Sequence, residues 1–219
     1  MIWHFLVNRS MRWALIFVLL IGTAPSRGDG PVERILFFGD SLTAGYGVEP
    51  DQAYPALIAR QLRAEGWAGE VINAGLSGET TAGGLRRVDW ILRQDIDIFV
   101  LALGGNDALR GIPPHVTREN LAGIVARVRT RYPDARIVLA GMQAPPNMGA
   151  DYTEAFRALF PSLAESLDLT LVPFLLEGVG GVVELNLADR IHPNPAGHER
   201  LAENVWTVLA PLVLAREDS

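Results

Sequence analysis

The sequence predicts an α/β protein, a three-layer α/β/α sandwich built around a five-stranded parallel sheet. Short apolar runs alternate with longer segments of helical periodicity from Glu33 onward, and this alternation is typical of βαβ units. The runs are continuous rather than alternating with polar residues, which indicates strands that are buried. Because 49% of the 219 residues are hydrophobic, we expect one packed domain of moderate size.

The first half of the chain contains three of the expected strands and two of the helices. Ile35–Phe38 is apolar at every position and predicts a buried strand. Apolar residues recur at helical spacing in Ala53–Glu65, and Gly66 then ends that helix. The next elements are a short strand at Val71-Ile72, a helix at Thr80–Gln94 and a strong continuous strand at Ile96–Leu103.

The second half continues the same alternation. A helix is expected at Thr117–Tyr132, with Thr117 and Asn120 near its start. The final helix is expected to begin at Pro195, because proline is favoured in the first helical turn. The remaining elements are a strand at Arg136–Ala140, a helix at Thr153–Leu167, a strand at Leu169–Val172 and the final helix at Pro195–Leu214.

The N-terminal segment, residues 1–30, is predicted to be a secretory signal peptide. Arg9 and Arg12 precede an apolar run from Trp13 to Ala24, which is shorter than the roughly 20 residues that a membrane span needs. Residues 31–219 then form the single domain, and the protein is expected to be periplasmic or secreted, without a stable membrane anchor. An uncleaved anchor is the alternative, Met11 is an alternative start, and the cleavage position stays open.

Composition excludes several classes of function. The net charge is −6 and all 19 basic residues are arginines, with no basic cluster of the kind that binds nucleic acid. The chain has no cysteine, so a thiol nucleophile and a disulfide are both excluded. Nothing in the composition indicates an oligomeric state.

Polar residues follow the predicted strands, and one serine among them is a candidate nucleophile. Ser41 follows the first strand, but a hydroxyl needs a neighbouring base to attack a carbonyl carbon. Of the four histidines, His4 lies in the signal segment, and we interpret His115, in a loop, and His198, in the last helix, as surface residues. His192 is left as the base.

The segment Asp189-Arg190-Ile191-His192 supplies a carboxylate for that base. A separation of three residues in a turn lets Asp189 reach the Nδ1 side of the His192 ring and fix its tautomer. Ser41, Asp189 and His192 are therefore a candidate triad. Three donors are candidates for an oxyanion hole, namely the N–H groups of Ser41 and Gly78 and the side-chain amide of Asn106.

Each of these residues also has a simpler structural interpretation. Ser41 can act as a helix cap, Gly78 as a turn glycine, and Asn106 and Asp107 as caps of the next segment. His192 can be a turn histidine and Asp189 a surface acid. We interpret Asp40 and Asp107 as structural residues, and Ser77 is a rival nucleophile whose neighbours fit a turn.

Four sequence blocks together resemble the SGNH/GDSL hydrolase family in order and spacing. They are Gly39-Asp40-Ser41-Leu42, Gly78 in "SGET", Gly104-Gly105-Asn106-Asp107 and Asp189-x-x-His192. The segments "LALGGNDALRGIPP", "EAFRALFPSLAES" and "LTLVPFLLEGV" resemble more narrowly the bacterial periplasmic arylesterase / acyl-CoA thioesterase I / lysophospholipase L1 group. The resemblance extends from about Glu33 to Leu214.

This resemblance implies a flavodoxin-like SGNH hydrolase fold and a serine hydrolase of esters and thioesters that needs no metal or other cofactor. It implies an acyl-enzyme on Ser41, a triad completed by Asp189 and His192, and an oxyanion hole of Ser41, Gly78 and Asn106. Two alternatives stay open, a binding protein with an inactive site and a carbohydrate O-acetylesterase on the same scaffold.

Three apolar segments are expected to border the site and to receive an acyl chain of the small-molecule ester or thioester. They are Ala108–His115, Met142–Tyr152 and Pro173–Leu187, which are rich in apolar residues and glycine and contain few charges. Long loops at the ends of strands often shape a binding site. The alternative is that these side chains only pack the loops onto the sheet.

Overall fold

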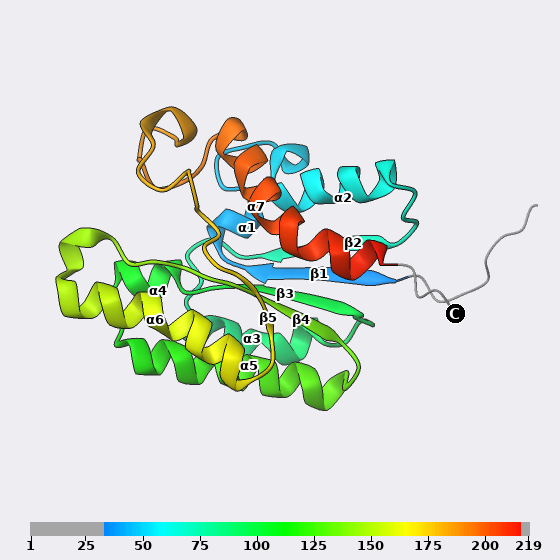
Figure 1. Ribbon diagram of the computed structural model, residues 1–219, viewed down its shortest axis with the longest axis horizontal. Helices are drawn as coiled ribbons and strands as arrows, with labels where there is room; N and C mark the ends of the chain where they lie inside the picture. Colours follow the sequence, from blue (N-terminus) through cyan, green and yellow to red (C-terminus); the bar gives the residue numbers. More distant parts are fainter. Residues whose placement is uncertain (1–32, 216–219) are drawn as a thin grey trace, which may run out of the picture. The chain divides into compact units, whose positions relative to one another are not determined.

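The computed structural model describes residues 33–215, in which helices cover both faces of one sheet (Figure 1). The predicted three-layer α/β/α sandwich is therefore confirmed. The predicted signal peptide, residues 1–30, lies outside the described residues and remains a prediction. None of the helices between residues 33 and 215 has the length and hydropathy that crossing a membrane requires.

The sheet has five strands, all parallel, in the order β2-β1-β3-β4-β5. This order is the flavodoxin-like one, in which sites form beyond the carboxyl ends of the strands. Gly39 at the end of β1, which lies between β2 and β3, pairs with both Gly75 and Ala102, so three strands end at the same edge. The strands are β1 (Arg34–Gly39), β2 (Glu70–Gly75), β3 (Ile98–Ala102), β4 (Arg136–Ala140) and β5 (Thr170–Val172).

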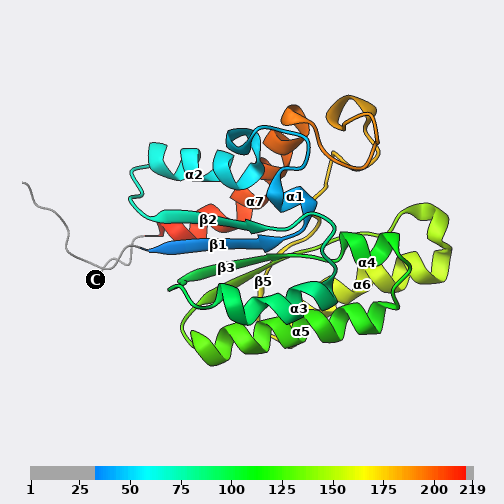
Figure 2. The ribbon, with the colours of Figure 1, turned by 180° about the vertical axis from the view of Figure 1, so that it is seen from behind.

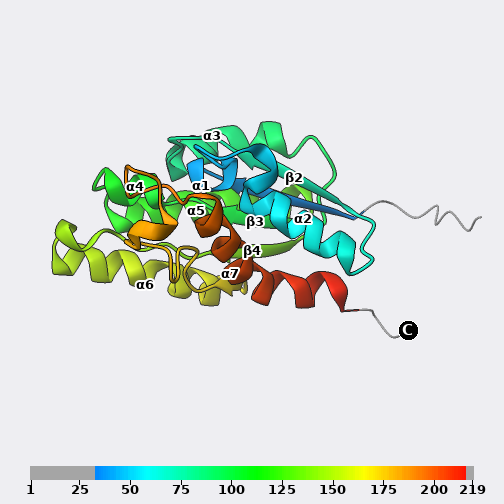
Figure 3. The ribbon, with the colours of Figure 1, turned by 90° about the horizontal axis from the view of Figure 1, so that it is seen from above.

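Five long helices form the two outer layers. Helices α2 (Tyr54–Ala64) and α7 (Pro195–Leu214) cover one face of the sheet. They lie above the strands in Figure 1 and on the near side of the strands in Figure 3, which looks from above. Helices α3 (Thr81–Ile91), α5 (Pro114–Arg131) and α6 (Ala150–Ser166) cover the other face, as the rear view in Figure 2 also shows. Right-handed crossovers between parallel strands produce this distribution of helices.

The shorter helices lie in the connections. The α-helices α1 (Ser41–Ala44) and α4 (Gly105–Leu109) directly follow β1 and β3 at the carboxyl edge of the sheet. Single 3₁₀ turns occur at Pro50–Gln52, Pro146–Met148 and Val183–Leu185.

The core lies on both sides of the central strands. All four apolar residues of Ile35–Phe38 are fully buried, as are most residues of β3. Burying one such side chain contributes about 1.5–3 kcal/mol to the free energy of folding. The continuous apolar runs in the sequence arise because helices cover these strands on both faces.

The predicted elements are confirmed, with small differences at their ends. Helix α5 begins at Pro114 rather than Thr117, because proline fits the first helical position, where its missing N–H is not needed. Strand β2 is longer than the predicted Val71-Ile72 and extends from Glu70 to Gly75. Helix α4 was not predicted, because five residues are too few to give a helical periodicity.

The prediction that His198 is a surface residue is wrong. Its side chain is fully buried between α7 and α2, where Nδ1 accepts a hydrogen bond from the backbone N–H of Tyr54 at 3.3 Å. The imidazole ring of His198 also stacks on the phenol ring of Tyr54, with the ring centroids 6.5 Å apart. Because Nδ1 is the acceptor, Nε2 carries the proton, and it has no partner among the described residues.

His115 is exposed, as predicted, but it lies in the first turn of α5 rather than in a loop.

We predict that His198 makes the protein less stable in acid. Burial lowers its pKa from 6.5 to about 4, and nearby His192 adds to this effect. At a pH between these two values the unfolded chain takes up a proton at His198 that the folded chain does not. The contribution of neutral His198 to the free energy of unfolding is therefore fully present above pH 6.5 and is lost as the pH falls toward 4. The free energy of unfolding should therefore drop by roughly 2 to 3 kcal/mol between pH 7 and 4.5 because of His198.

Urea unfolding of the wild type and of His198→Leu at both pH values measures this contribution. The other titrating groups are common to both proteins, so the difference between the two proteins isolates His198. Parallel pH dependences in the two proteins would contradict the prediction.

Candidate active site

Ser41 is presented by a tight turn between β1 and α1. Gly39 allows this turn, because a Cβ atom there would lie 2.7 Å from the Cβ of Thr43 and 2.8 Å from the carbonyl oxygen of Ala102. Asp40 caps α1 by accepting a hydrogen bond from the N–H of Leu42 at 3.1 Å. Ser41 is the first residue of the helix, so its own N–H has no partner within α1.

The structure brings Ser41, His192 and Asp189 together in one line of hydrogen bonds. The Oγ of Ser41 lies 3.0 Å from Nε2 of His192, and Nδ1 of the same ring lies 2.7 Å from Oδ2 of Asp189. Ser77 is exposed, and among the described residues His192 contacts Ser41 and not Ser77. The rival nucleophile therefore has no base beside it.

Asp189 is held by the turn that it shares with His192. Its Oδ1 accepts hydrogen bonds from the N–H groups of Ile191 at 2.9 Å and His192 at 3.0 Å, which leaves Oδ2 for the ring. Three hydrogen bonds lower the pKa of Asp189 to about 2. The largest effect comes from the backbone N–H of His192, the next from the His192 ring, and the third from the backbone N–H of Ile191. The carboxylate is thus charged at neutral pH.

The segment that carries His192 is anchored at both ends. The carbonyl of His192 accepts a hydrogen bond from the N–H of Leu187 at 2.7 Å, and Asn186 bridges to Pro193. Asn194 then caps α7 by accepting from the N–H of Gly197. On its other side the His192 ring packs against the ring of Tyr46, with a centroid distance of 4.5 Å.

Asn106, the second residue of α4, reaches Asp40, the neighbour of Ser41. Gly104 has a φ of +125°, which favours glycine, and it turns the chain directly from β3 into α4. The amide Nδ2 of Asn106 then donates to Oδ2 of Asp40 at 3.2 Å. Asp40 is buried, and this burial raises its pKa to about 6 although hydrogen bonds from Leu42 and Asn106 oppose the rise.

Asp107 is a structural residue, as predicted from the sequence. It is fully buried and accepts hydrogen bonds from the N–H and the hydroxyl of Thr81 and from the hydroxyl of Thr117 at 3.3 Å. These bonds connect α4 to the first turns of α3 and α5. The position of Asn106, one residue earlier, therefore depends on this buried carboxylate.

Gly78 lies in the turn after β2 with a φ of +78°, a conformation that favours glycine. Its carbonyl accepts a hydrogen bond at 3.0 Å from Arg110, which follows α4. Within residues 33–215 Gly78 is connected to α4 through this arginine and makes no direct hydrogen bond to Ser41 or Asn106. Glu79, the next residue, is buried and forms an ion pair with the partly buried Arg87 of α3, which also donates to the Ala74 carbonyl.

Sequence reasoning did not find Arg110 or the Glu79–Arg87 pair. The only signal for the pair was an acid that directly follows the glycine in "SGET" and an arginine in the helix behind it. Opposite charges at this separation are common on protein surfaces, so the pattern alone did not indicate a buried contact.

Six of the seven large exposed apolar side chains between residues 33 and 215 lie in the connections that leave the carboxyl ends of the strands. Each is between 36% and 56% exposed, and together they come from the connections after β1, β2, β3 and β5. Trp90, on α3, is the exception among the large exposed apolar residues of the described chain. The residues in these loops are Tyr46, Leu76, Leu109, Val182, Val183 and Ile191.

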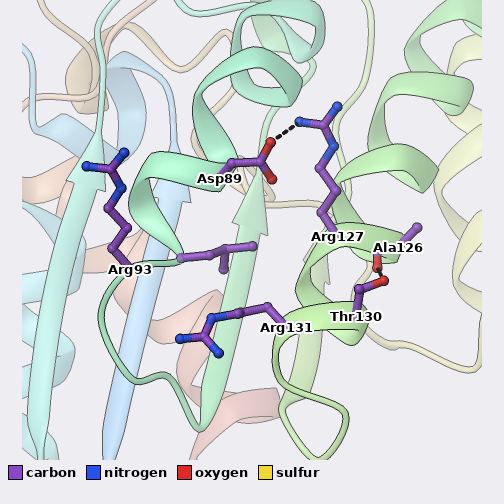
Figure 4. A pocket seen from close by; sticks show the side chains of 7 residues that line it. Asp89, Arg93, Ala126, Arg127, Thr130 and Arg131 are labelled. Carbon is purple, nitrogen blue, oxygen red and sulfur yellow. Dashed lines mark hydrogen bonds and ion pairs between the residues drawn. The ribbon is translucent and has the colours of Figure 1, made fainter.

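A surface hollow in residues 33–215 lies away from these connections. It has a volume of about 590 Å³ and lies between α3 and α5, where the side chains of Asp89, Arg93, Arg127 and Arg131 surround it (Figure 4). Asp89 and Arg127 form an ion pair across it at 2.7 Å. None of the candidate site residues lines this hollow, so its size does not indicate the place of catalysis.

Comparisons with known proteins agree with the geometry. The GDSL-like Lipase/Acylhydrolase family model matches residues 37–200. The chain is 42% identical over 182 residues to the esterase TesA of Pseudomonas aeruginosa, which covers 83% of this chain and 90% of that protein. A crystal structure of TesA superposes with a TM-score of 0.78 at 42% identity, over 82% of this chain and 99% of that chain.

Two further relatives are similar over most of their length. An arylesterase of Vibrio mimicus is 37% identical over 174 residues, which cover 79% of this chain and 86% of that protein. The thioesterase 1/protease 1/lysophospholipase L1 of Escherichia coli is 35% identical over 207 residues, which cover 94% of this chain and 96% of that protein. The chain therefore belongs to the GDSL-like lipase/acylhydrolase family and is a GDSL-type ester hydrolase.

Proposed function

We propose that the protein hydrolyses carboxylic esters and thioesters through an acyl-enzyme on Ser41. The observation that supports this most is the line of hydrogen bonds from Ser41 Oγ to His192 Nε2 at 3.0 Å and from His192 Nδ1 to Asp189 at 2.7 Å. Asp189 holds the tautomer in which Nε2 is free to accept a proton. A serine beside a base that is itself oriented is the arrangement that nucleophilic acyl transfer needs.

In the first half-reaction His192 takes the proton of Ser41 while Oγ attacks the carbonyl carbon of the substrate. The tetrahedral intermediate then collapses, and the bond to the leaving oxygen or sulfur breaks as Nε2 returns the proton to that atom. In the second half-reaction water repeats the same steps, which releases the carboxylic acid and restores Ser41.

The negative charge on the carbonyl oxygen is stabilised by three donors. They are the N–H of Ser41 at the start of α1, the N–H of Gly78 and the amide of Asn106. Each belongs to a different loop at the carboxyl edge of the sheet, and their neighbours Asp40, Asp107 and Arg110 connect these loops. Donors held by such connections need little reorganisation as the charge develops.

We predict that Ser41→Ala abolishes hydrolysis of p-nitrophenyl acetate and leaves the fold intact. Loss of the nucleophile typically lowers kcat by about 10⁴- to 10⁶-fold. A serine-directed phosphonate should label the wild type at Ser41, as peptide mass spectrometry will reveal. Ser77→Ala is the matched control and should keep wild-type activity. Label on Ser77 would reject the assignment.

We predict that Asp189→Asn lowers kcat by up to about 10⁴-fold with a smaller change in KM. An amide at this position can still accept the two backbone N–H bonds, but it then presents its NH₂ group to the ring and favours the wrong tautomer of His192. Steady-state kinetics with p-nitrophenyl acetate measures the effect. A variant with the wild-type kcat would remove Asp189 from the mechanism.

The substrate is proposed to carry an acyl chain that lies against the apolar loops. Leu109 and Val183 are 48% and 56% exposed and lie in two of the three segments expected to border the site. Apolar side chains that are exposed in the connections around a site can bury a hydrocarbon chain. One relative is named a lysophospholipase and thioesterase, names that describe substrates with acyl chains.

We predict that kcat/KM rises from p-nitrophenyl acetate to hexanoate by up to roughly 200-fold, because each buried CH₂ contributes about 0.8 kcal/mol. Leu109→Ser and Val183→Ser should reduce this preference and leave acetate hydrolysis nearly unchanged. Trp90→Ser, which removes an apolar side chain that is 63% exposed on α3, is the control and should change neither value. A steep fall beyond acetate would indicate a small acetyl pocket, as in a carbohydrate O-acetylesterase.

The protein is proposed to act outside the cytoplasm, as a periplasmic or secreted enzyme. The sequence of residues 1–30 supports this, with its two arginines before a short apolar run. We predict that mature protein recovered from a bacterial periplasm begins between about Pro25 and Pro31. N-terminal sequencing measures the start, and exported protein that begins at Met1 would contradict cleavage.

A further inference from the structure

Asp40 is a buried acid at the centre of the site with no role in the steps above. Its side chain is 2% exposed. One oxygen, Oδ1, accepts from the N–H of Leu42 at 3.1 Å, and the other, Oδ2, accepts from Nδ2 of Asn106 at 3.2 Å. A buried carboxylate costs free energy unless its hydrogen bonds compensate, so the protein retains this acid at a cost.

The charge state of Asp40 determines which end of the Asn106 amide faces it. An ionised carboxylate only accepts hydrogen bonds, so it selects the NH₂ end of the amide. The nitrogen has a second N–H, which this bond leaves free to donate to another acceptor. A protonated Asp40 can donate instead, and the amide can turn over so that its oxygen takes the place of its nitrogen.

We infer that Asp40 is a positioning residue that, in its ionised form, holds the Asn106 amide with an N–H directed to the oxyanion. The inference rests on the proposed role of Asn106 as an oxyanion donor. A turned amide would place a carbonyl oxygen where negative charge develops, and this would repel the transition state. Asp40 thus acts through Asn106 and does not touch the substrate.

The charged and titratable groups around Asp40 determine when it ionises. His192 faces it from the segment before α7, Asp107 from α4 and Tyr54 from α2. Burial is the largest effect and raises the pKa to about 6, and His192 and Asp107 act in opposite directions. Asp40 is therefore ionised above this pH and becomes protonated below it, within the range in which esterases can be assayed.

The substitution Asp40→Asn tests the inference directly. An asparagine that keeps its oxygen on the N–H of Leu42 must present its NH₂ group to Asn106, which forces the amide to turn over. We expect kcat for p-nitrophenyl acetate to fall by about 10²-fold, the effect of losing one oxyanion donor, with little change in KM. The control is Asp97→Asn, the same change at an exposed residue before β3, which should leave kcat unchanged.

A double-mutant cycle with Asn106→Ala separates positioning from a purely structural role. If Asp40 acts through Asn106, adding Asp40→Asn to Asn106→Ala should lower kcat by less than about threefold further. If Asp40 instead places Ser41 through the turn, the two losses should multiply, and this result would overturn the inference. Wild-type kcat in the single Asp40→Asn variant would overturn it as well.

The pH dependence supplies a test that needs no change at Asp40, in case Asp40→Asn does not fold. Protonation of Asp40 should lower kcat of the wild type by up to about 10²-fold as the pH falls through about 6, because the amide then no longer directs its N–H to the oxyanion. In Asn106→Ala this step should be absent, because no amide remains for Asp40 to orient, so the ratio of wild-type to variant kcat should fall toward one below pH 6. A ratio that does not change with pH would reject the inference.

These outcomes differ from a failure of the proposed function. Wild-type kcat in Ser41→Ala or Asn106→Ala would reject the mechanism itself. A strongly impaired Asn106→Ala combined with multiplicative losses would reject only the role of Asp40.

Discussion

The parallel register around β1 is the constraint on which the site depends. Gly39 pairs with Gly75 on one side and Ala102 on the other, so the loops that carry Ser41, Gly78 and Asn106 all begin at the same level of the sheet. The continuous apolar core of β1 and β3 resists a shift of this register, because a one-residue slip would turn every side chain to the other face. The chemistry can therefore be built from loops far apart in sequence.

Two acids in the site have opposite environments and correspondingly opposite titration behaviour. Asp189, whose side chain is 37% exposed, accepts three hydrogen bonds that favour its charged form, and its pKa falls to about 2. Asp40 is buried and accepts only two, and its pKa rises to about 6. One carboxylate is thus charged at neutral pH, whereas the other is close to its change of state at mildly acidic pH.

Much of this molecule follows from patterns within short stretches of sequence. The apolar runs predicted the five strands, and helical spacing predicted α2, α3, α5, α6 and α7 to within a few residues. The four sequence blocks predicted which loops meet, and Asp189 lies within a turn of His192 as the separation of three residues indicated. These features depend on local periodicity and on the topology of parallel sheets, which the order of residues encodes directly.

Contacts between distant elements needed the tertiary structure. His198 looked like a surface residue on the last helix, but α2 covers it and its Nδ1 accepts from Tyr54. The bond between Asp40 and Asn106, the ion pair of Glu79 with Arg87 and the bond from Arg110 to Gly78 likewise join separate loops. The sequence by itself determined the fold class, the family and the candidate triad, because each depends on local pattern and motif order. Only packing decided burial, hydrogen-bond partners and pKa, because these depend on which elements approach one another in space.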